Sequence, residues 1–213
     1  MPQLQISEIF CSLQGEGRST GFRTAFIRLT GCPLRCSYCD TRYAFTGGEP
    51  MALEDILHQT AQYKVKYVTV TGGEPMAQPE VLPLLSQLCD QGYEVSLESS
   101  GALDLSGVDA RVIKIMDLKT PASGETSANH YSNIELLQPQ DQLKFVICSE
   151  ADYVWSKEKL LEYNLAERCE LLFSACHGYL APTQLADWVL RDALPVRFQL
   201  QLHRILWDDK RGK

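Results

Sequence analysis

The sequence contains no long hydrophobic run, and this absence removes a class of function. Nowhere do its 213 residues approach the roughly 20 uninterrupted apolar residues that a bilayer-spanning helix needs. Residues 1–5 also lack the basic region followed by an apolar run that marks a secretory signal. The sequence therefore predicts a cytoplasmic protein that does not enter a membrane.

Positive charge is also scarce. Lysine and arginine number 20 against 27 aspartate and glutamate residues, which gives a formal net charge of -7. Binding to a nucleic-acid backbone depends on clustered lysine and arginine. Lys64 with Lys66, and Lys210 with Arg211, are groups too short to form such a surface. A small-molecule substrate is therefore favoured, and no nucleic-acid partner is predicted.

Cysteine is too sparse for a scaffold held by disulfides. The eight cysteines make up about 4% of the 213 residues, well below the density of disulfide-rich secreted domains. Three of the eight crowd into residues 32–39, while the other five are scattered. Clustered thiols in a reducing compartment indicate a metal site.

The sequence that remains is typical of one globular domain over residues 1–213, with 45% hydrophobic and 22% charged residues. Short β-rich runs are predicted at residues 26–29, 67–70, 93–97, 112–116, 143–147, 171–173 and 198–202. Between them, three helical faces are formed by Leu53, Ile56, Leu57 and Ala61, by Val81, Leu84, Leu85 and Leu88, and by Leu185, Trp188 and Val189. This alternation predicts an α/β fold with a largely parallel sheet, in which functional residues gather where strands end.

Two further segments have their own predictions. Residues 121–133 are rich in Ala, Ser, Gly, Thr and Asn, and predict either a mobile surface loop or a lid over a site. Gly-Gly-Glu-Pro occurs twice, at residues 47–50 and 72–75. Only the second copy directly follows a predicted strand, so the first is interpreted as a turn and helix start.

The cysteine loop holds Cys32, Cys36 and Cys39, and follows the strand that ends near Leu29. Three ligands are too few for a structural zinc site or an ordinary four-iron cluster, each of which takes four. With three cysteines, a four-iron cluster keeps one iron open to a chelating group, such as the amino and carboxylate groups of S-adenosylmethionine.

A different class of protein remains open at this point. If Cys11, Cys176 or His177 supplied a fourth ligand, the chain would be a non-catalytic zinc or electron-transfer module.

The spacing C-x3-C-x-aromatic-C, with Tyr38 at the aromatic position, resembles the signature of the radical S-adenosylmethionine (SAM) superfamily. Residues 6–17, 26–32 and 39–41 narrow the resemblance to the 7-carboxy-7-deazaguanine synthases, and it extends to residues 201–203. It implies an incomplete TIM-like β/α barrel, shorter than the roughly 250 residues of a full barrel. It also implies a homodimer that receives electrons from a donor such as flavodoxin or ferredoxin.

The activity implied by the resemblance is that of a lyase in queuosine biosynthesis. Such an enzyme converts 6-carboxy-5,6,7,8-tetrahydropterin to 7-carboxy-7-deazaguanine with release of ammonia. The implied cofactors are a 4Fe-4S cluster, SAM and Mg²⁺. The alternative within enzymes is a radical SAM activating enzyme that acts on a protein partner, since small size and an Asp-Leu-Lys strand end are shared with that group.

The resemblance also assigns residues. The implied metal ligands are Cys32, Cys36 and Cys39 for the cluster and Thr41 for magnesium. The implied cofactor contacts are Tyr38, Cys39, Asp40, Gly73, Asp117, Lys119, Ser174, Ala175, Cys176 and His177. The implied substrate contacts are Leu13, Gln14, Gly15, Arg28, Thr71 and His203, with Arg28 at the substrate carboxylate. Residues 117–119 and 174–177 depart from the Ser-Pro-Lys and Gln-Pro forms that also occur in the family.

Overall fold

The computed structural model describes residues 2–208 and 210–213, and a nine-stranded sheet runs through them. The strands, in spatial order, are β3 (Glu49–Ala52), β1 (Gln3–Leu13), β2 (Arg23–Leu29), β4 (Tyr67–Gly72), β5 (Glu94–Ser99), β6 (Ile113–Asp117), β7 (Gln142–Ile147), β8 (Glu170–Ala175) and β9 (Arg197–Gln199). From β2 to β9 neighbouring strands are parallel, whereas β1 runs antiparallel to both β2 and β3. The predicted α/β fold with a largely parallel, partly closed sheet is confirmed.

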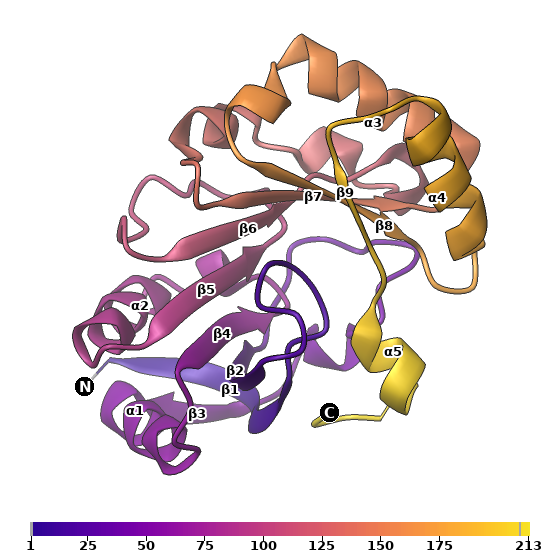
Figure 1. Ribbon diagram of the computed structural model, residues 1–213. Helices are drawn as coiled ribbons and strands as arrows, with labels where there is room; N and C mark the ends of the chain where they lie inside the picture. The colour runs from indigo at the N-terminus through magenta and orange to yellow at the C-terminus, as the bar shows by residue number, and fades with distance from the viewer. Residues whose placement is uncertain (1, 209) are drawn as a thin grey trace.

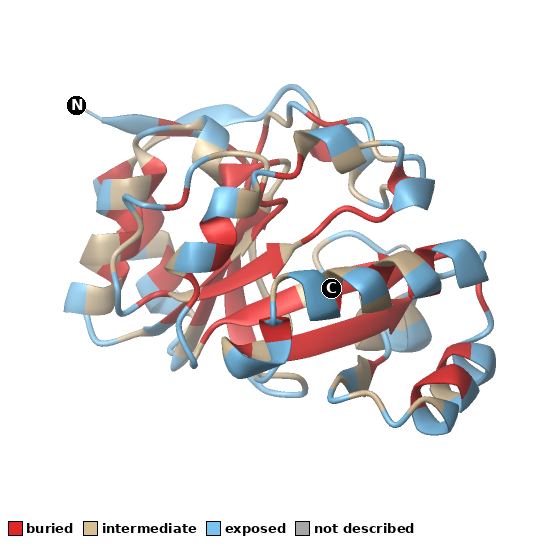
Figure 2. Cartoon of the chain, turned by 90° about the horizontal axis from the view of Figure 1, so that it is seen from above, coloured by how far each residue is buried: buried red, intermediate tan, exposed pale blue. Residues whose placement is uncertain are grey.

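Among the described residues, four α-helices cover the outer face of the curved sheet and a short fifth one lies on its inner face. They are α1 (Leu53–Gln62), α2 (Val81–Asp90), α3 (Glu150–Glu162), α4 (Pro182–Arg191) and the short α5 (Leu202–Trp207). The first four lie on the convex side, while α5 and the loop that follows β1 lie on the concave side (Figure 1). Viewed from above, the central strands are largely buried, whereas α1 to α4 carry both buried and exposed residues (Figure 2).

The parallel strands are apolar toward the helices and polar toward the concave side. Successive side chains of a strand point to opposite faces of the sheet. In β4, Val68 and Val70 therefore join the core beneath α1 and α2, while Thr71 lines a cavity on the other face. In β7, Phe145 joins the core beneath α3 and α4, while Lys144 lines the same cavity. The sheet thus has one face for stability and one for a site.

Two predicted boundaries are wrong. The terminal strand predicted over residues 198–202 ends at Gln199, and Leu202 already begins α5. In the segment interpreted as a turn and helix start at residues 47–50, Gly47 and Gly48 take positive φ angles just before a strand begins. Residues Glu49–Ala52 form β3, because the exposed edge of β1 pairs with them before α1 begins at Leu53.

Residues 121–133 are ordered by hydrogen bonds, and none of them lines the cavity on the concave side. They fold into successive 3-10 turns, and Asn129 fixes them by accepting from the Lys119 backbone N–H and donating to the Lys119 carbonyl, each at 2.9 Å. The same segment holds the cysteine loop, since Ser37 donates from its backbone N–H to the Ser123 carbonyl and from its hydroxyl to the Ala122 carbonyl. The polar side chains of residues 121–133 are therefore explained by the hydrogen bonds that they make.

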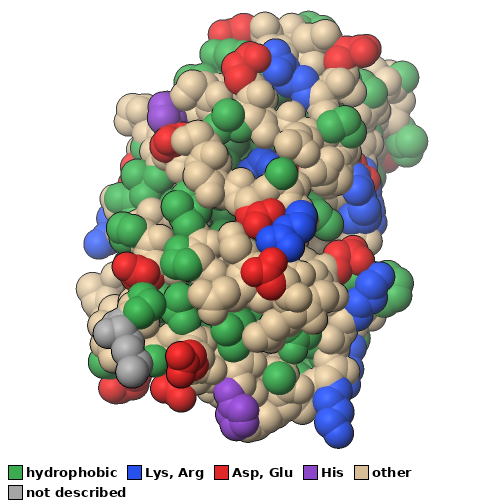
Figure 3. Space-filling view, turned by 90° about the vertical axis from the view of Figure 1, so that its left-hand side faces the viewer, with side chains coloured by type: hydrophobic (Ala, Val, Ile, Leu, Met, Phe, Trp, Pro, Cys, Tyr) green, Lys and Arg blue, Asp and Glu red, His purple; other side chains and the backbone are tan. Residues whose placement is uncertain are grey.

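The outer surface carries charges of both signs. On the face turned to the viewer in Figure 3, lysine and arginine side chains stand in small separate groups among aspartate and glutamate. None of the helices in the described part of the chain combines the length and apolarity needed to cross a membrane.

One ion pair is buried between the sheet and the helices. Lys114 Nζ lies 2.8 Å from Asp141 Oδ2, and the two side chains are 5% and 0% exposed. Asp141 also accepts from the backbone N–H groups of Lys114 and Gln138, each at 2.8 Å. The aspartate therefore joins β6 to the segment that leads into β7.

Removing this buried charge should destabilise the fold. Asp141→Asn leaves the Lys114 ammonium buried without a counter-charge, so we expect the free energy of unfolding to fall by about 3 kcal/mol. Urea denaturation measures it. The control is Asp90→Asn, whose exposed pair with Arg111 should contribute less than about 1 kcal/mol. Equal losses in the two variants would contradict the role given to Asp141.

Candidate active site

A cavity of about 250 Å³ lies on the concave side of the sheet, around the carboxyl ends of β4 to β8. Among the residues that line it are 17 of those predicted from the sequence: Leu13, Gln14, Gly15, Arg28, Cys32, Cys36, Tyr38, Cys39, Asp40, Thr41, Thr71, Gly73, Asp117, Lys119, Cys176, His177 and His203. Ser174 and Ala175 are instead buried within β8 and do not line it. The fold therefore brings residues from both ends of the chain to one place.

The cysteine loop is braced by its own arginines. Arg35 Nη1 donates to the carbonyls of Cys32 and Leu34, each at 2.7 Å. Arg42 Nη2 donates to the Ser37 carbonyl at 2.6 Å. These bonds satisfy carbonyl groups that have no strand or helix partner, so the loop keeps a defined shape outside regular secondary structure.

The three thiols of the loop are free and partly buried. Burial raises the pKa of Cys32, Cys36 and Cys39, in the case of Cys36 to about 11, and the nearby Lys119 ammonium partly opposes this shift. Uncharged thiols lose their protons when they bind a metal, so metal binding here releases protons.

A closed site for one zinc ion is not formed. Within residues 2–208 and 210–213, no three His, Cys, Asp or Glu side chains are placed to hold a single metal ion. Of the candidates for a fourth ligand, Cys11 does not line the cavity, Cys176 lines it but packs against Cys148 and Val146, and His177 lines it. Three thiols around an open cavity fit the larger iron-sulfur cluster with one corner left for a ligand.

The turn after β4 packs directly on the cysteine loop. A Cβ atom on Gly72 would stand 2.2 Å from the Leu29 carbonyl oxygen, and one on Gly73 would stand 2.2 Å from the Gly31 carbonyl oxygen. The Glu74 backbone N–H donates to that same Gly31 oxygen at 2.7 Å. Glycine is therefore required here because two backbones touch.

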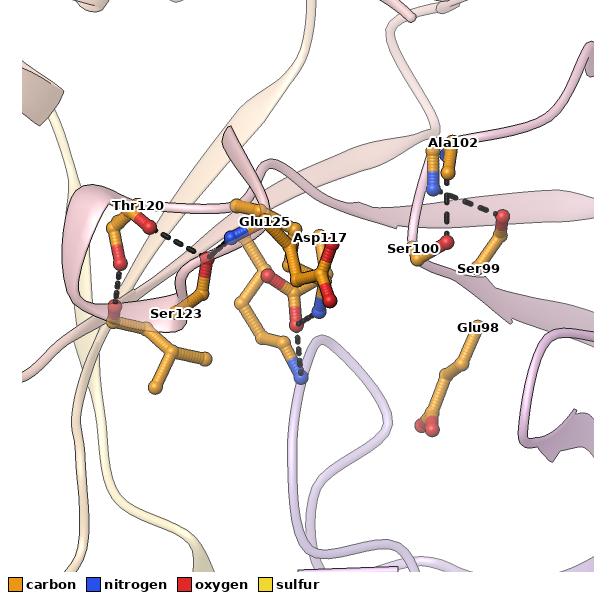
Figure 4. A network of polar contacts seen from close by, with 12 residues as sticks. Glu98, Ser99, Ser100, Ala102, Asp117, Thr120, Ser123 and Glu125 are labelled. Atoms are coloured by element: carbon orange, nitrogen blue, oxygen red, sulfur yellow. Dashed lines mark hydrogen bonds and ion pairs between the residues drawn. The ribbon is translucent and has the colours of Figure 1, made fainter. Parts of the chain in front are cut away.

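Glu74, which sequence reasoning did not single out, connects this turn to the end of β5. Its buried carboxylate accepts from the Ser99 hydroxyl at 3.0 Å, and from the Ser100 backbone N–H at 2.7 Å and the Ser100 hydroxyl. The two serines lie beside Glu98, on the strand next to the one that ends in Asp117 (Figure 4). Glu74 thus fixes the rim of the cavity rather than facing a ligand.

Asp117 presents an unsatisfied acceptor. Its Oδ2 atom lies 3.0 Å from Lys119 Nζ, whereas Oδ1 is buried without a hydrogen-bond partner in the described part of the chain. Buried carboxylate oxygens are rarely left unpaired. Because Asp117 lines the cavity, its free acceptor fits the hydroxyl or amino group of a bound cofactor such as SAM.

The loop after β1 forms another wall of the cavity. Gln14 Nε2 donates to Thr69 Oγ1 at 3.0 Å and to Glu98 Oε1 at 3.4 Å. Thr71 Oγ1 donates to Glu98 Oε2 at 2.8 Å. The Gly15 carbonyl accepts from the Leu202 backbone N–H at 3.1 Å, so this loop is also joined to the start of α5.

Arg28 is oriented by neighbours that the sequence did not reveal. Its Nε lies 2.9 Å from Glu8 Oε1, and its guanidinium stands over the rings of Phe10 and Tyr43. Within the described residues, Nη1 and Nη2 have no hydrogen-bond partner. Glu8 therefore uses one edge of the guanidinium and leaves two donors for an acid in the cavity.

Asp40 and Thr41 follow the last cysteine. Thr41 Oγ1 donates to Asp40 Oδ1 at 2.8 Å, and Arg204 Nη2 lies 3.8 Å from Asp40 Oδ2. Burial acts to raise the pKa of Asp40, but the Thr41 hydroxyl and the Arg204 charge outweigh it and hold this pKa below its usual value. Asp40 is therefore an anion at neutral pH.

Comparison with known proteins finds similar chains over nearly the whole length of this one. A model of the radical SAM superfamily matches residues 26–120. The chain is 44% identical to a 7-carboxy-7-deazaguanine synthase of Chlorobaculum tepidum over 213 residues, which cover 98% of this chain and 97% of that protein. A protein of the same name from Koribacter versatilis is 39% identical over 219 residues, covering 96% of this chain and 97% of its own.

Solved structures share the fold. The crystal structure of QueE from Escherichia coli superimposes with a TM-score of 0.78 at 23% identity, covering 94% of this chain and 95% of that one. The crystal structure of Streptococcus suis SuiB bound to S-adenosylmethionine superimposes with a TM-score of 0.55 at 13% identity. The match covers 79% of this chain and 44% of that one.

The loop after β1 approaches α5 so closely at position 15 that only a glycine fits there. A Cβ atom there would stand 2.5 Å from His203 Nδ1 and 3.1 Å from the His203 backbone nitrogen. We expect Gly15→Ala to displace α5, so that trypsin cleaves after Arg204 several-fold faster, as followed by mass spectrometry. Gly107→Ala, whose new atom meets only the flexible end of Leu82, is the control. An unchanged cleavage rate in Gly15→Ala would show that α5 does not need this contact.

Proposed function

The chain belongs to the 7-carboxy-7-deazaguanine synthase family of radical SAM enzymes, and we propose that it converts 6-carboxy-5,6,7,8-tetrahydropterin to 7-carboxy-7-deazaguanine with release of ammonia, a step toward queuosine. One observation carries the proposal. A single cavity is lined both by the three cysteines and by an arginine with two unused donors, Arg28. The cysteines suit a radical cofactor, and the arginine suits a small carboxylated substrate.

The family implies a 4Fe-4S cluster and SAM. Bound at this site, a reduced cluster and SAM would supply radical chemistry for removing a hydrogen atom from the substrate. We assign Cys32, Cys36 and Cys39 to the cluster and Asp117 to a donor group of SAM. Further SAM contacts are proposed for Tyr38, Asp40, Gly73, Lys119, Cys176 and His177, which all line the cavity, whereas the predicted contacts at Ser174 and Ala175 are not kept because neither residue lines it. The polypeptide positions the cofactor and the substrate and shields them from water, as is usual where a cofactor performs the difficult step.

We propose that the substrate binds in the part of the cavity between the loop after β1 and Arg28. Arg28 holds the substrate carboxylate through Nη1 and Nη2 in a bidentate pair, which a lysine ammonium cannot form. Leu13, Gln14 and Gly15 contact the pterin edge, Thr71 hydrogen-bonds the substrate, and His203 forms part of the wall. The loop and α5 together exclude water from this region, because the Gly15 carbonyl binds the Leu202 N–H.

Magnesium is proposed to bind at Thr41 when substrate is present. The Thr41 hydroxyl lines the cavity beside the anionic Asp40. A hydroxyl, substrate oxygens and water make a suitable set for a hard cation that prefers oxygen and retains water.

We further propose a flavodoxin or ferredoxin as electron donor, a homodimer, and a cytoplasmic location. The dimer is supported by exposed apolar side chains near the end of the chain, namely Leu200 after β9 and Ile205 and Leu206 on α5.

Product analysis tests the proposed function. The reconstituted, reduced enzyme is incubated anaerobically with the pterin and SAM, and the products are identified by mass spectrometry. Formation of 7-carboxy-7-deazaguanine and ammonia is expected. Cleavage of SAM with the pterin unchanged would keep the radical cofactor and refute the substrate, and a radical found on a protein partner would favour an activating enzyme.

Cluster loading should depend on three of the eight cysteines. Replacing Cys32, Cys36 or Cys39 by alanine removes one ligand, so iron and sulfide content after anaerobic reconstitution should fall to a small fraction of wild type. Cys11→Ala and Cys89→Ala serve as controls, since neither thiol lines the cavity, and should load normally. Normal loading in a Cys36→Ala variant would refute the assigned ligand set.

Substrate binding should depend on Arg28. Arg28→Ala removes a charged bidentate contact, so we expect kcat/KM for the pterin to fall by about 100-fold or more with normal iron content. Arg28→Lys keeps the charge without the planar fork and should be intermediate. Arg168→Ala, which breaks the exposed pair with Glu135, is the matched control. Unchanged kcat/KM in Arg28→Ala would place the substrate carboxylate elsewhere.

A further inference from the structure

Lys144 connects two walls of the cavity that belong to distant parts of the sequence. Its Nζ lies 3.0 Å from Glu16 Oε2, on the loop after β1, and 3.8 Å from Asp117 Oδ2, at the end of β6. The three side chains are only 14 to 15% exposed, and all three line the cavity. The Lys144 ammonium group therefore lies between two carboxylates in a part of the cavity that is largely shielded from solvent.

Glu16 is held from its other side by the end of the sheet. Gln199 Nε2 donates to Oε2 at 3.1 Å and Gln201 Nε2 donates to Oε1 at 3.2 Å. Gln199 Oε1 in turn accepts from the Gly17 backbone N–H at 2.9 Å. These neutral amides orient the carboxylate but do not neutralise it, and Lys144 is the cation paired with it among the described residues.

Asp117 depends on Lys144 in a different way. Lys119 already lies 3.0 Å from its Oδ2 atom, so Lys144 is a second and more distant cation there. Burial acts to lower the pKa of Lys144, but the carboxylates of Glu16, Asp117 and Glu98 outweigh it, so this pKa is raised and the lysine stays charged. Without that charge the carboxylates would repel one another across the cavity.

Transfer of a hydrogen atom from the substrate to a radical requires the substrate to be held at a fixed distance from the cofactor. Reacting atoms must lie within about 3 to 3.5 Å, and a displacement of about 1 Å can cost on the order of 100-fold in rate. In this chain the loop after β1 is on the proposed substrate side and Asp117 is on the proposed cofactor side. Lys144 is the side chain in ionic contact with both.

We propose that Lys144 is a positioning residue that holds the Glu16 loop and Asp117 at a fixed separation, so that cleavage of SAM stays coupled to conversion of the substrate. This inference rests on the proposed function for its account of coupling. The geometric part, that Lys144 fixes the Glu16 loop, stands on the contacts alone.

The test uses reconstituted holoenzyme and two variants. Lys144→Met keeps the length of the side chain and removes its charge, whereas Lys144→Arg keeps the charge. In Lys144→Met we expect the ratio of 5′-deoxyadenosine released to product formed to rise about ten-fold over wild type, with partial recovery in Lys144→Arg. Lys157→Met, which breaks the pair with Asp192 on the outer helices, is the control and should leave the ratio unchanged.

A second measurement does not depend on turnover. Hydrogen exchange of the backbone amides in residues 14–22 should become at least several-fold faster in Lys144→Met, while exchange in α1 and α2 stays as in wild type. If the wild-type enzyme formed no 7-carboxy-7-deazaguanine but this local effect appeared, the proposed function would fail and the positioning role would stand. Unchanged exchange in residues 14–22, or product and 5′-deoxyadenosine that fall together, would overturn the inference.

Discussion

The two-residue period of the parallel strands is the constraint on which the rest of this structure depends. Each strand must bury apolar side chains beneath the helices and also supply polar groups to the cavity, and it does so with alternate residues. Phe145 and Lys144, neighbours in sequence, therefore belong to the core and to the site respectively. If the pairing of β7 slipped by one residue, Lys144 would enter the core and Phe145 would enter the cavity, so that both the core packing and the site would be lost.

Much of this arrangement was predictable because it is local. The apolar spacing at Leu53, Ile56 and Leu57 marks α1, and β4 to β8 appear as short β-rich runs. The cysteine spacing likewise carries its own chemistry. Helix α3 escaped prediction because its apolar side chains do not form one face, Val154 and Leu161 being exposed. Its N-cap Ser149, which accepts from the Asp152 N–H, was a signal that could have marked its start.

The rest was not predictable because it depends on contacts between distant segments. Strand β3 exists only because β1 offers an edge to pair with. The partnership of Arg28 with Glu8 joins two antiparallel strands, and that of Lys144 with Glu16 spans 128 residues. Even so, the alternation of Ser96 with Glu98, and of Gln142 with Lys144, marks the polar face of two strands. The polar positions of β7 could have pointed to Lys144 as a residue of the site.

The support of the cysteine loop by residues 121–133 has a consequence for the order of assembly in the cell. Ser37 and Ala122, which hydrogen-bond, are 85 residues apart, and synthesis at roughly 5 to 20 residues per second separates them by roughly 4 to 17 s. During that interval a nascent cysteine loop has its own arginines and, later, the turn after β4 to shape it, but not residues 121–133. Correct loading of a metal cluster is thereby tied to a chain whose first six strands have already left the ribosome.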